Sequence, residues 1–136
     1  MAANNNPIYC ASGNITVGQT IATANTAKDG TGTVVTVHTA GANGSRVEKV
    51  RFRALGTNVA TVARCFINNG GTNATATNNV LYEELTLPAT TLSEVAQLLN
   101  QELLLNLVLP AGYKLIFTIG TTVAAGYAIT AVSGDY

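Results

Sequence analysis

Apolar and polar residues alternate along much of this chain, and turn-forming residues interrupt the alternation about every ten positions. The clearest case is Leu103, Leu105, Leu107 and Leu109, which stand at strict period two in a segment that ends at Pro110. Successive side chains of a strand point to opposite faces of a sheet, so this spacing predicts a strand with one buried face. Repeated along the chain, the pattern predicts an all-β fold of about eight antiparallel strands.

Seven other segments show the same alternation with different strength. They are residues 15–21, which form the weakest segment, 33–39, 46–55, 59–68, 80–87, 113–119 and 126–132. The dipeptide Asn43-Gly44 favours a tight turn, so the segments on either side of it are predicted to pair as an antiparallel hairpin. Residues 91–100 allow two interpretations, a short helix or an irregular crossover, because their apolar residues also fit helical spacing.

Chain length and the character of the N-terminal residues predict the domain organisation. A chain of 136 residues is long enough to bury one core, so residues 14–136 are predicted to form a single jelly-roll or β-sandwich domain. Residues 1–13 are rich in Asn and show little periodicity, which predicts a flexible N-terminal arm. Its sizeable apolar side chains, Ile8 and Tyr9, are candidate contacts for a partner.

Charged residues are few and balanced. Seven Lys and Arg offset seven Asp and Glu, so no overall field attracts nucleic acid or an anionic membrane. No apolar run is long enough to span a bilayer, and the first residues lack the pattern of a secretion signal, so we expect synthesis in the cytoplasm. Weak charge repulsion between copies favours a homodimer, another homo-oligomer or a subunit of a larger assembly.

Neither the histidine nor the cysteines form a recognisable reactive motif. His38 is the single histidine, and alternation predicts that it shares a strand face with Val34 and Thr36. A lone histidine is too little for a metal site or for a hydrolytic base with its partners. Cys10 and Cys65 have no neighbouring Cys or His, so we expect two small buried hydrophobic residues and no disulfide.

The carboxylates do not converge on one position either. Glu83 and Glu84 are adjacent, and adjacent strand residues point to opposite faces, which excludes the paired carboxylates of a glycosidase. Alternation instead allows Glu83 to meet Arg64 as a partly buried ion pair of structural importance. We therefore expect no enzyme, no catalytic residue, no metal and no cofactor.

The most concentrated charge is a row of three cations, Lys49, Arg51 and Arg53, on one predicted strand face, opposite the apolar Val50 and Phe52. The row fits an ordinary solvated sheet face. It also fits a docking strip for an acidic protein partner, because a guanidinium can hold a carboxylate through two hydrogen bonds. Nucleic acid is a weaker third interpretation, since one row without aromatic platforms makes few phosphate contacts.

Several turn and strand motifs resemble a family of small proteins encoded by tailed bacteriophages and their prophages. They read DGTGTVVTV at 29–37, TAGANGSR at 39–46, ALGTN at 54–58, FINNG at 66–70 and LVLPAGY at 107–113. The resemblance implies a head decoration, or cement, protein. Such a protein is a jelly roll on the outer surface of the virion capsid that clamps neighbouring major capsid protein subunits, and it associates with further copies of itself.

A receptor-binding or glycan-binding module of a phage tail or fibre is the alternative, because jelly rolls also serve as lectins. Carbohydrate sites usually use an exposed aromatic side chain beside polar groups. The chain contains no Trp, and Tyr82, Tyr113, Tyr127 and Tyr136 are the tyrosines that could supply such a platform.

Overall fold

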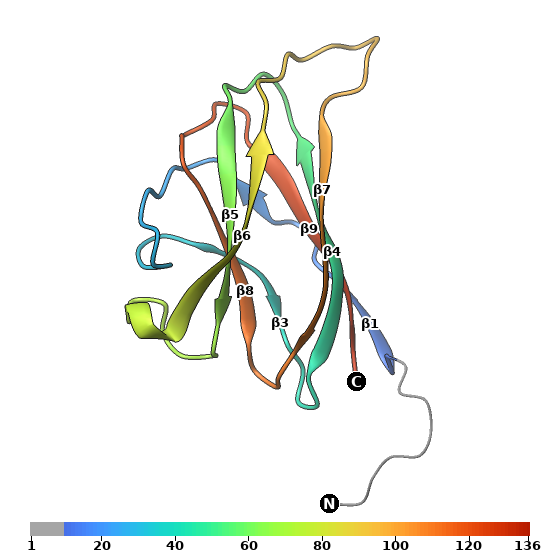
Figure 1. The fold of residues 1–136 in the computed structure, drawn as a ribbon. Coiled ribbons are helices and arrows are strands. Elements are labelled where there is room, and N and C mark those ends of the chain that lie inside the picture. The colour runs from blue at the N-terminus through green and yellow to red at the C-terminus, as the bar shows by residue number, and fades with distance from the viewer. Residues whose placement is uncertain (1–9) are drawn as a thin grey trace, which may run out of the picture.

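A computed structural model describes residues 10–136, which form nine β-strands and one three-residue 3-10 helix (Figure 1). The strands are β1 (Ser12–Ile15), β2 (Thr20–Ile21), β3 (Val35–Thr39), β4 (Ser45–Ala54), β5 (Thr61–Asn68), β6 (Asn79–Leu87), β7 (Asn100–Leu109), β8 (Lys114–Ile119) and β9 (Tyr127–Asp135). The helix, η1, spans Ala76–Asn78. Each strongly alternating segment corresponds to one strand, and the weak segment 15–21 overlaps two short strands.

The strands form two antiparallel sheets packed face to face. Sheet A has the order β1-β9-β4-β7, with β2 also paired to β9, and sheet B has the order β3-β8-β5-β6. The pairing joins the first strands to the last and proceeds inward: β1 and β2 with β9, β3 with β8, β4 with β7, and β5 with β6. A long hairpin rolled up in this way is a jelly roll, so the predicted fold class is confirmed.

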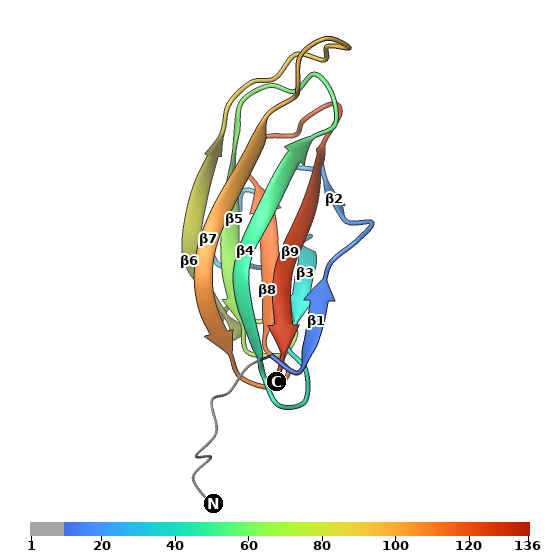
Figure 2. The same ribbon diagram turned by 90° about the vertical axis from the view of Figure 1, so that its right-hand side faces the viewer.

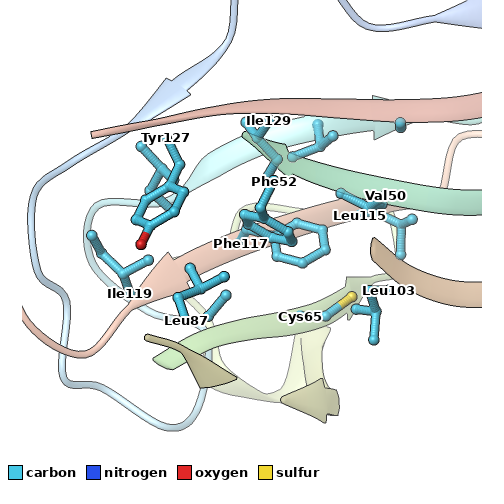
Figure 3. Close-up of a cluster of buried hydrophobic side chains, with 14 of the residues drawn as sticks. Val50, Phe52, Cys65, Leu87, Leu103, Leu115, Phe117, Ile119, Tyr127 and Ile129 are labelled. Atoms are coloured by element: carbon cyan, nitrogen blue, oxygen red, sulfur yellow. The ribbon is translucent and has the colours of Figure 1, made fainter. Parts of the chain in front are cut away.

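The core lies between the sheets and consists of the inward-pointing residues of both. Phe52 on β4 and Phe117 on β8 meet edge to face, with ring centroids 5.4 Å apart and an interplanar angle of 68° (Figure 3). Val50 on sheet A and Leu115 on sheet B are also fully buried. Large apolar side chains that meet across two sheets supply most of the stability of such a sandwich, and truncating one of the Phe rings costs about 3–5 kcal/mol.

The hairpin predicted around Asn43-Gly44 is wrong, although the turn itself is present. Gly44 has a positive φ of 88°, and its N–H donates to the carbonyl oxygen of Gly41 (3.0 Å). The strands on either side lie in different sheets, β3 in sheet B and β4 in sheet A. The turn therefore crosses from one sheet to the other, because each strand buries its apolar face against the opposite layer.

Residues 91–100 form the irregular crossover and not the short helix. Leu92 and Val95 are 54% and 97% exposed, so the apolar stripe of a helix would have nothing to pack against. The Ser93 hydroxyl oxygen accepts hydrogen bonds from the N–H groups of Val95 (3.2 Å) and Ala96 (3.1 Å). In this serine turn the hydroxyl oxygen binds N–H groups that it would also cap at the start of a helix, but no helix follows.

Two loops cover part of the outward face of sheet B. Phe66 and Ile116 point away from the core but are 0% and 1% exposed. The loops 22–34 and 69–79 lie beside this sheet in Figure 1 and are tied together by asparagine side chains. Asn73 Nδ2, for example, donates to the carbonyl oxygens of Gly30 (3.1 Å) and Gly32 (2.8 Å), which holds the two loops together.

The N-terminal boundary of the domain lies earlier than predicted. Strand β1 begins at Ser12, so residues 12 and 13, assigned to the arm, belong to sheet A. The two apolar residues proposed as partner contacts of the arm, Ile8 and Tyr9, lie outside the described residues.

Candidate binding surface

Residues 10–136 bring no metal-binding cluster together. No group of three or more His, Cys, Asp or Glu side chains converges in this part of the chain. Four surface cavities measure about 120 to about 370 Å³, and the one of about 370 Å³ lies within the loop that joins β6 to β7. None of the helical structure described is long and apolar enough to cross a membrane.

His38 is buried, and the prediction that it shares a face with Thr36 is wrong. The register between β3 and β8 shifts between Thr36 and His38, which places His38 opposite the core residue Leu115. Its Nδ1 lies 3.1 Å from the hydroxyl oxygen of Ser133, and its Nε2 has no hydrogen-bond partner. Burial lowers the pKa of His38, and the nearby Asp135 carboxylate offsets part of this effect.

The serine, histidine and aspartate that meet here do not form a nucleophilic site. The Ser133 hydroxyl donates to the carbonyl oxygen of Asn14 (2.6 Å), so the His38 Nδ1–H must donate to Ser133 and cannot accept its proton. Asp135 accepts hydrogen bonds from Ser45 Oγ and from Asn14 Nδ2 (3.1 Å), which lower the pKa of its carboxyl group. The cluster is a hydrogen-bond network that joins β1, β3, β4 and β9.

Both cysteines carry free thiols. Cys65 is fully buried in the core, where loss of hydration and the neighbouring Glu83 carboxylate raise the pKa of its thiol to about 12. Cys10 is exposed, so its predicted burial is wrong. A thiol with a pKa of about 12 is protonated at neutral pH and unreactive.

Arg64 pairs with Glu84 and not with the predicted Glu83. The two residues are cross-strand partners on the outward side of β5 and β6, and Arg64 Nε lies 2.9 Å from Glu84 Oε1. Glu83 stands opposite Cys65, on the other side of the strand. The expectation that Glu83 and Glu84 point to opposite faces is therefore correct, and the error lay in which of them faces Arg64.

The cation row lies on the outward face of sheet A, which Figure 2 shows from the front. Arg51 and Arg53 are exposed and Lys49 is half-buried, while Val50 and Phe52 between them are 0% exposed. This is the alternation that the sequence predicts. We refer to the outward side of sheet A as the open face.

Part of the charge on the open face is neutralised by a carboxylate from the neighbouring strand. Glu102 on β7 is the cross-strand partner of Arg51, whose Nε and Nη2 lie 3.0 and 2.5 Å from Glu102 Oε1. Lys49 Nζ lies 3.3 Å from the same oxygen. Hydrogen bonds from Arg51 first, and then from Lys49, lower the pKa of Glu102.

Two other cations on β4 remain available to a partner. Arg53 and Arg46 are exposed, and the ion pairs within the described residues do not involve them. Arg46 reaches only the side-chain oxygen of Asn106, at 3.4 Å. The open face thus carries four of the seven cations of the chain.

Aliphatic side chains surround these cations. Ile15, Val132, Lys49 and Leu104 are successive cross-strand partners on β1, β9, β4 and β7, so they form a row across the whole sheet. Ile15 is 61% and Leu104 68% exposed. Val108 is 60% exposed and opposes Arg46 in a second row, which makes the face both apolar and cationic.

The two outer faces of the sandwich therefore differ. On sheet B, Phe66 of β5 and Ile116 of β8 are buried beneath loops, and the exposed apolar side chains lie on the edge strand β6. The open face of sheet A instead exposes aliphatic side chains on β1 and β7, on either side of its cations. Reasoning from the sequence located the three cations but missed Ile15, Leu104 and Val108. Their exposure becomes visible only when the strand order is known, because alternation alone does not say which face a second layer covers.

The tyrosines offer little to a carbohydrate. Tyr127 is fully buried, and Tyr113 and Tyr136 are half-buried. Tyr82 on β6 is 45% exposed, and no second exposed aromatic side chain accompanies it among residues 10–136.

Comparison of the chain with protein families, with curated proteins and with solved structures finds no match in any of the three.

Proposed function

We propose that this protein is a structural component of a phage virion that binds the outside of the capsid and stabilises contacts between major capsid protein subunits. The observation that carries the proposal is the open face, a sheet surface on which exposed aliphatic side chains lie beside unpaired cations. The resemblance of several turn motifs to head decoration proteins supplies the class of partner.

The open face has the chemistry of a protein-docking surface. Burial of an exposed Leu or Ile contributes about 1.5–3 kcal/mol, so Ile15, Leu104 and Val108 together can provide several kcal/mol. Arg46 and Arg53 add specificity by pairing with carboxylates of the partner. Because these side chains project from hydrogen-bonded strands, little backbone conformational entropy is lost when the partner binds.

The same features support self-association within the assembly. The chain has no net charge, and nothing in its charge balance keeps copies apart. On a capsid surface, neighbouring copies are also held at high local concentration by the lattice that they decorate.

Rebinding to stripped capsids tests the proposal. Heads of the phage that encodes the chain are purified, stripped of it and mixed with purified wild-type protein or with variants. Leu104→Ser and Arg53→Glu change exposed residues of the open face, so each should weaken binding at least tenfold while the melting temperature changes little. Val80→Ser, which alters a 56% exposed side chain on β6 of sheet B, is the matched control and should bind like the wild type.

The copy number in the particle separates this function from the receptor-binding alternative. A decoration protein occurs in amounts comparable to the major capsid protein, and its removal lowers the resistance of heads to heat. A receptor-binding module occurs in few copies on the tail, and its removal abolishes attachment to the host. Wild-type protein that fails to rebind stripped heads would refute the proposal.

A further inference from the structure

The end of the sandwich opposite the C-terminus carries a second exposed apolar surface. The loop of residues 88–99 projects there beyond the strands, in yellow and orange in Figure 1. Val95 and Leu92 in this loop are 97% and 54% exposed, and Val59 and Leu55 in the adjacent turn are 56% and 48% exposed. We call these four residues the apolar tip. These four side chains lie on two loops that are joined by the Asn58–Thr90 pairing and the Leu92–Thr57 hydrogen bond, and such exposure of large aliphatic side chains marks an interaction surface.

The base of this loop is held firmly by buried hydrogen bonds. Asn58 is 3% exposed; its Nδ2 donates to the carbonyl oxygen of Gly126 (3.0 Å), and its Oδ1 accepts from the N–H groups of Ala125 (2.8 Å) and Gly126 (3.0 Å). The backbones of Asn58 and Thr90 bond to each other in both directions, at 3.1 and 2.9 Å. The Thr90 hydroxyl donates to the carbonyl oxygen of Gly56 (2.7 Å).

The backbone of the tip is also fixed. The Leu92 N–H donates to the hydroxyl oxygen of Thr57 (3.0 Å), which ties the loop to the neighbouring turn. Ser93 Oγ accepts from the N–H groups of Val95 and Ala96 and sets the bend that presents Val95 to solvent. These hydrogen bonds hold apolar side chains away from the core of the domain, as in a preorganised binding loop.

The chemistry of the loop indicates a protein partner. Glu94 is the only charged residue in 88–99, and the segment contains no Lys, Arg, Trp or Tyr. A loop that inserts into a lipid surface usually carries such cations and aromatic side chains. A symmetric contact between two copies of the tip would set two loops with the same Glu94 charge against each other, which disfavours it. A different protein with an apolar pocket and a nearby cation complements both the aliphatic side chains and Glu94.

We propose that the apolar tip is an anchor that inserts into an apolar pocket on a second capsid subunit, next to a Lys or Arg that pairs with Glu94. This inference rests on the proposed function, because it names the second of the two subunits that the protein joins. The open face and the apolar tip occupy different parts of the sandwich, so one copy can hold two subunits at once.

The experiment uses the same stripped heads with variants of the tip. Val95→Ser should weaken rebinding about tenfold or more, because an apolar side chain that fills a pocket is lost. Glu94→Lys should weaken it as well, and Glu94→Gln should do so less. Val17→Ser is the matched control, since Val17 is 81% exposed but lies in the connection between β1 and β2. All four variants should melt within about 2 °C of the wild type, because the changed side chains contribute little to the core.

The outcomes separate the two proposals. If Leu104→Ser weakens binding and Val95→Ser does not, the anchor is refuted and the capsid function remains. If wild-type protein does not bind heads, both fail. If Val95→Ser instead abolishes self-association in sedimentation equilibrium, the occupant of the tip is a second copy. If the wild type floats with phosphatidylcholine and phosphatidylglycerol vesicles and Val95→Ser does not, the occupant is a lipid surface. Either of these last two results overturns the anchor.

Discussion

His38 shows how one residue couples the stability of the sandwich to pH. It is 3% exposed, its Nδ1–H donates to Ser133, and its Nε2 has no partner. A second proton on the ring would place an unpaired donor and a positive charge in the core. Asp135 is the ionisable group that acts on His38, and it only partly offsets the burial that lowers the pKa of His38.

We therefore predict that the free energy of unfolding falls as the pH drops through the ordinary histidine pKa of 6.5. The unfolded chain takes up a proton near that pH while the folded chain does not, so stability is full above it and decreases below it, by at most about 1.4 kcal/mol per pH unit. Urea unfolding between about pH 5 and pH 8 measures this slope. In the same range Asp135, whose pKa is lowered from 3.8, stays ionised.

His38→Gln serves as the comparison, because glutamine fills a similar volume and does not titrate. The variant should be less stable than the wild type at pH 8, and its unfolding free energy should depend less on pH. An equal slope in the two proteins would show that another group is responsible.

At the scale of single elements, the crossover between β6 and β7 combines a rigid base with an apolar tip. The rigidity depends on Asn58, whose amide satisfies two backbone N–H groups and the carbonyl oxygen of Gly126 inside the protein. Asn58 thus supplies the hydrogen bonds that regular secondary structure would otherwise supply to the backbone of the adjoining turns.

Asn58→Ala should lower the free energy of unfolding by about 2–4 kcal/mol, because the buried N–H and carbonyl groups of Gly126 lose their partner. Chemical denaturation measures the loss. Asn69→Ala is the control, since Asn69 is exposed at a loop surface and its replacement should cost less than about 1 kcal/mol. Similar losses in the two variants would contradict the role assigned to Asn58.

The elements also show what the sequence could and could not predict. Alternation located the strands and the cation row on β4, because burial of one sheet face leaves a direct period-two signal. It could not reveal the irregularity before His38, since a single inserted residue reverses the faces of all that follow. It could not assign Glu102 to Arg51 or Glu84 to Arg64, because cross-strand pairing between distant segments depends on register. The alternation also could not show whether the turn at Gly44 joins two neighbouring strands of one sheet or two strands of different sheets.

At the scale of the whole molecule, a net charge of zero conceals an uneven distribution. The open face and its edge hold four cations, Arg46, Lys49, Arg51 and Arg53, against two carboxylates, Glu48 and Glu102. The rest of the chain holds three cations against five carboxylates. The molecule is therefore polarised, with its positive side on the surface that we assign to the capsid.

This polarity predicts that attachment to stripped heads depends on salt. Raising the NaCl concentration from about 0.05 M to about 0.5 M should weaken binding of the wild type roughly tenfold, because exposed charges are screened over shorter distances. Arg53→Gln, which removes one unpaired cation and adds no new charge, should reduce that dependence. Binding of both proteins that is unaffected by salt would show that the cations do not contact the partner.

The pairing of the first strand with the last makes the fold nearly cyclic. Ser12 and Asp135 are cross-strand neighbours, and the N–H of Ala11 donates to the carbonyl oxygen of Asp135 at 2.7 Å. Each strand would keep its neighbours if the chain were joined at this point and opened in another loop. Sequence attached after Tyr136 would also emerge at the end of the sandwich away from loop 88–99, so the particle surface could carry added segments there while the apolar tip stays clear of them (Figure 1).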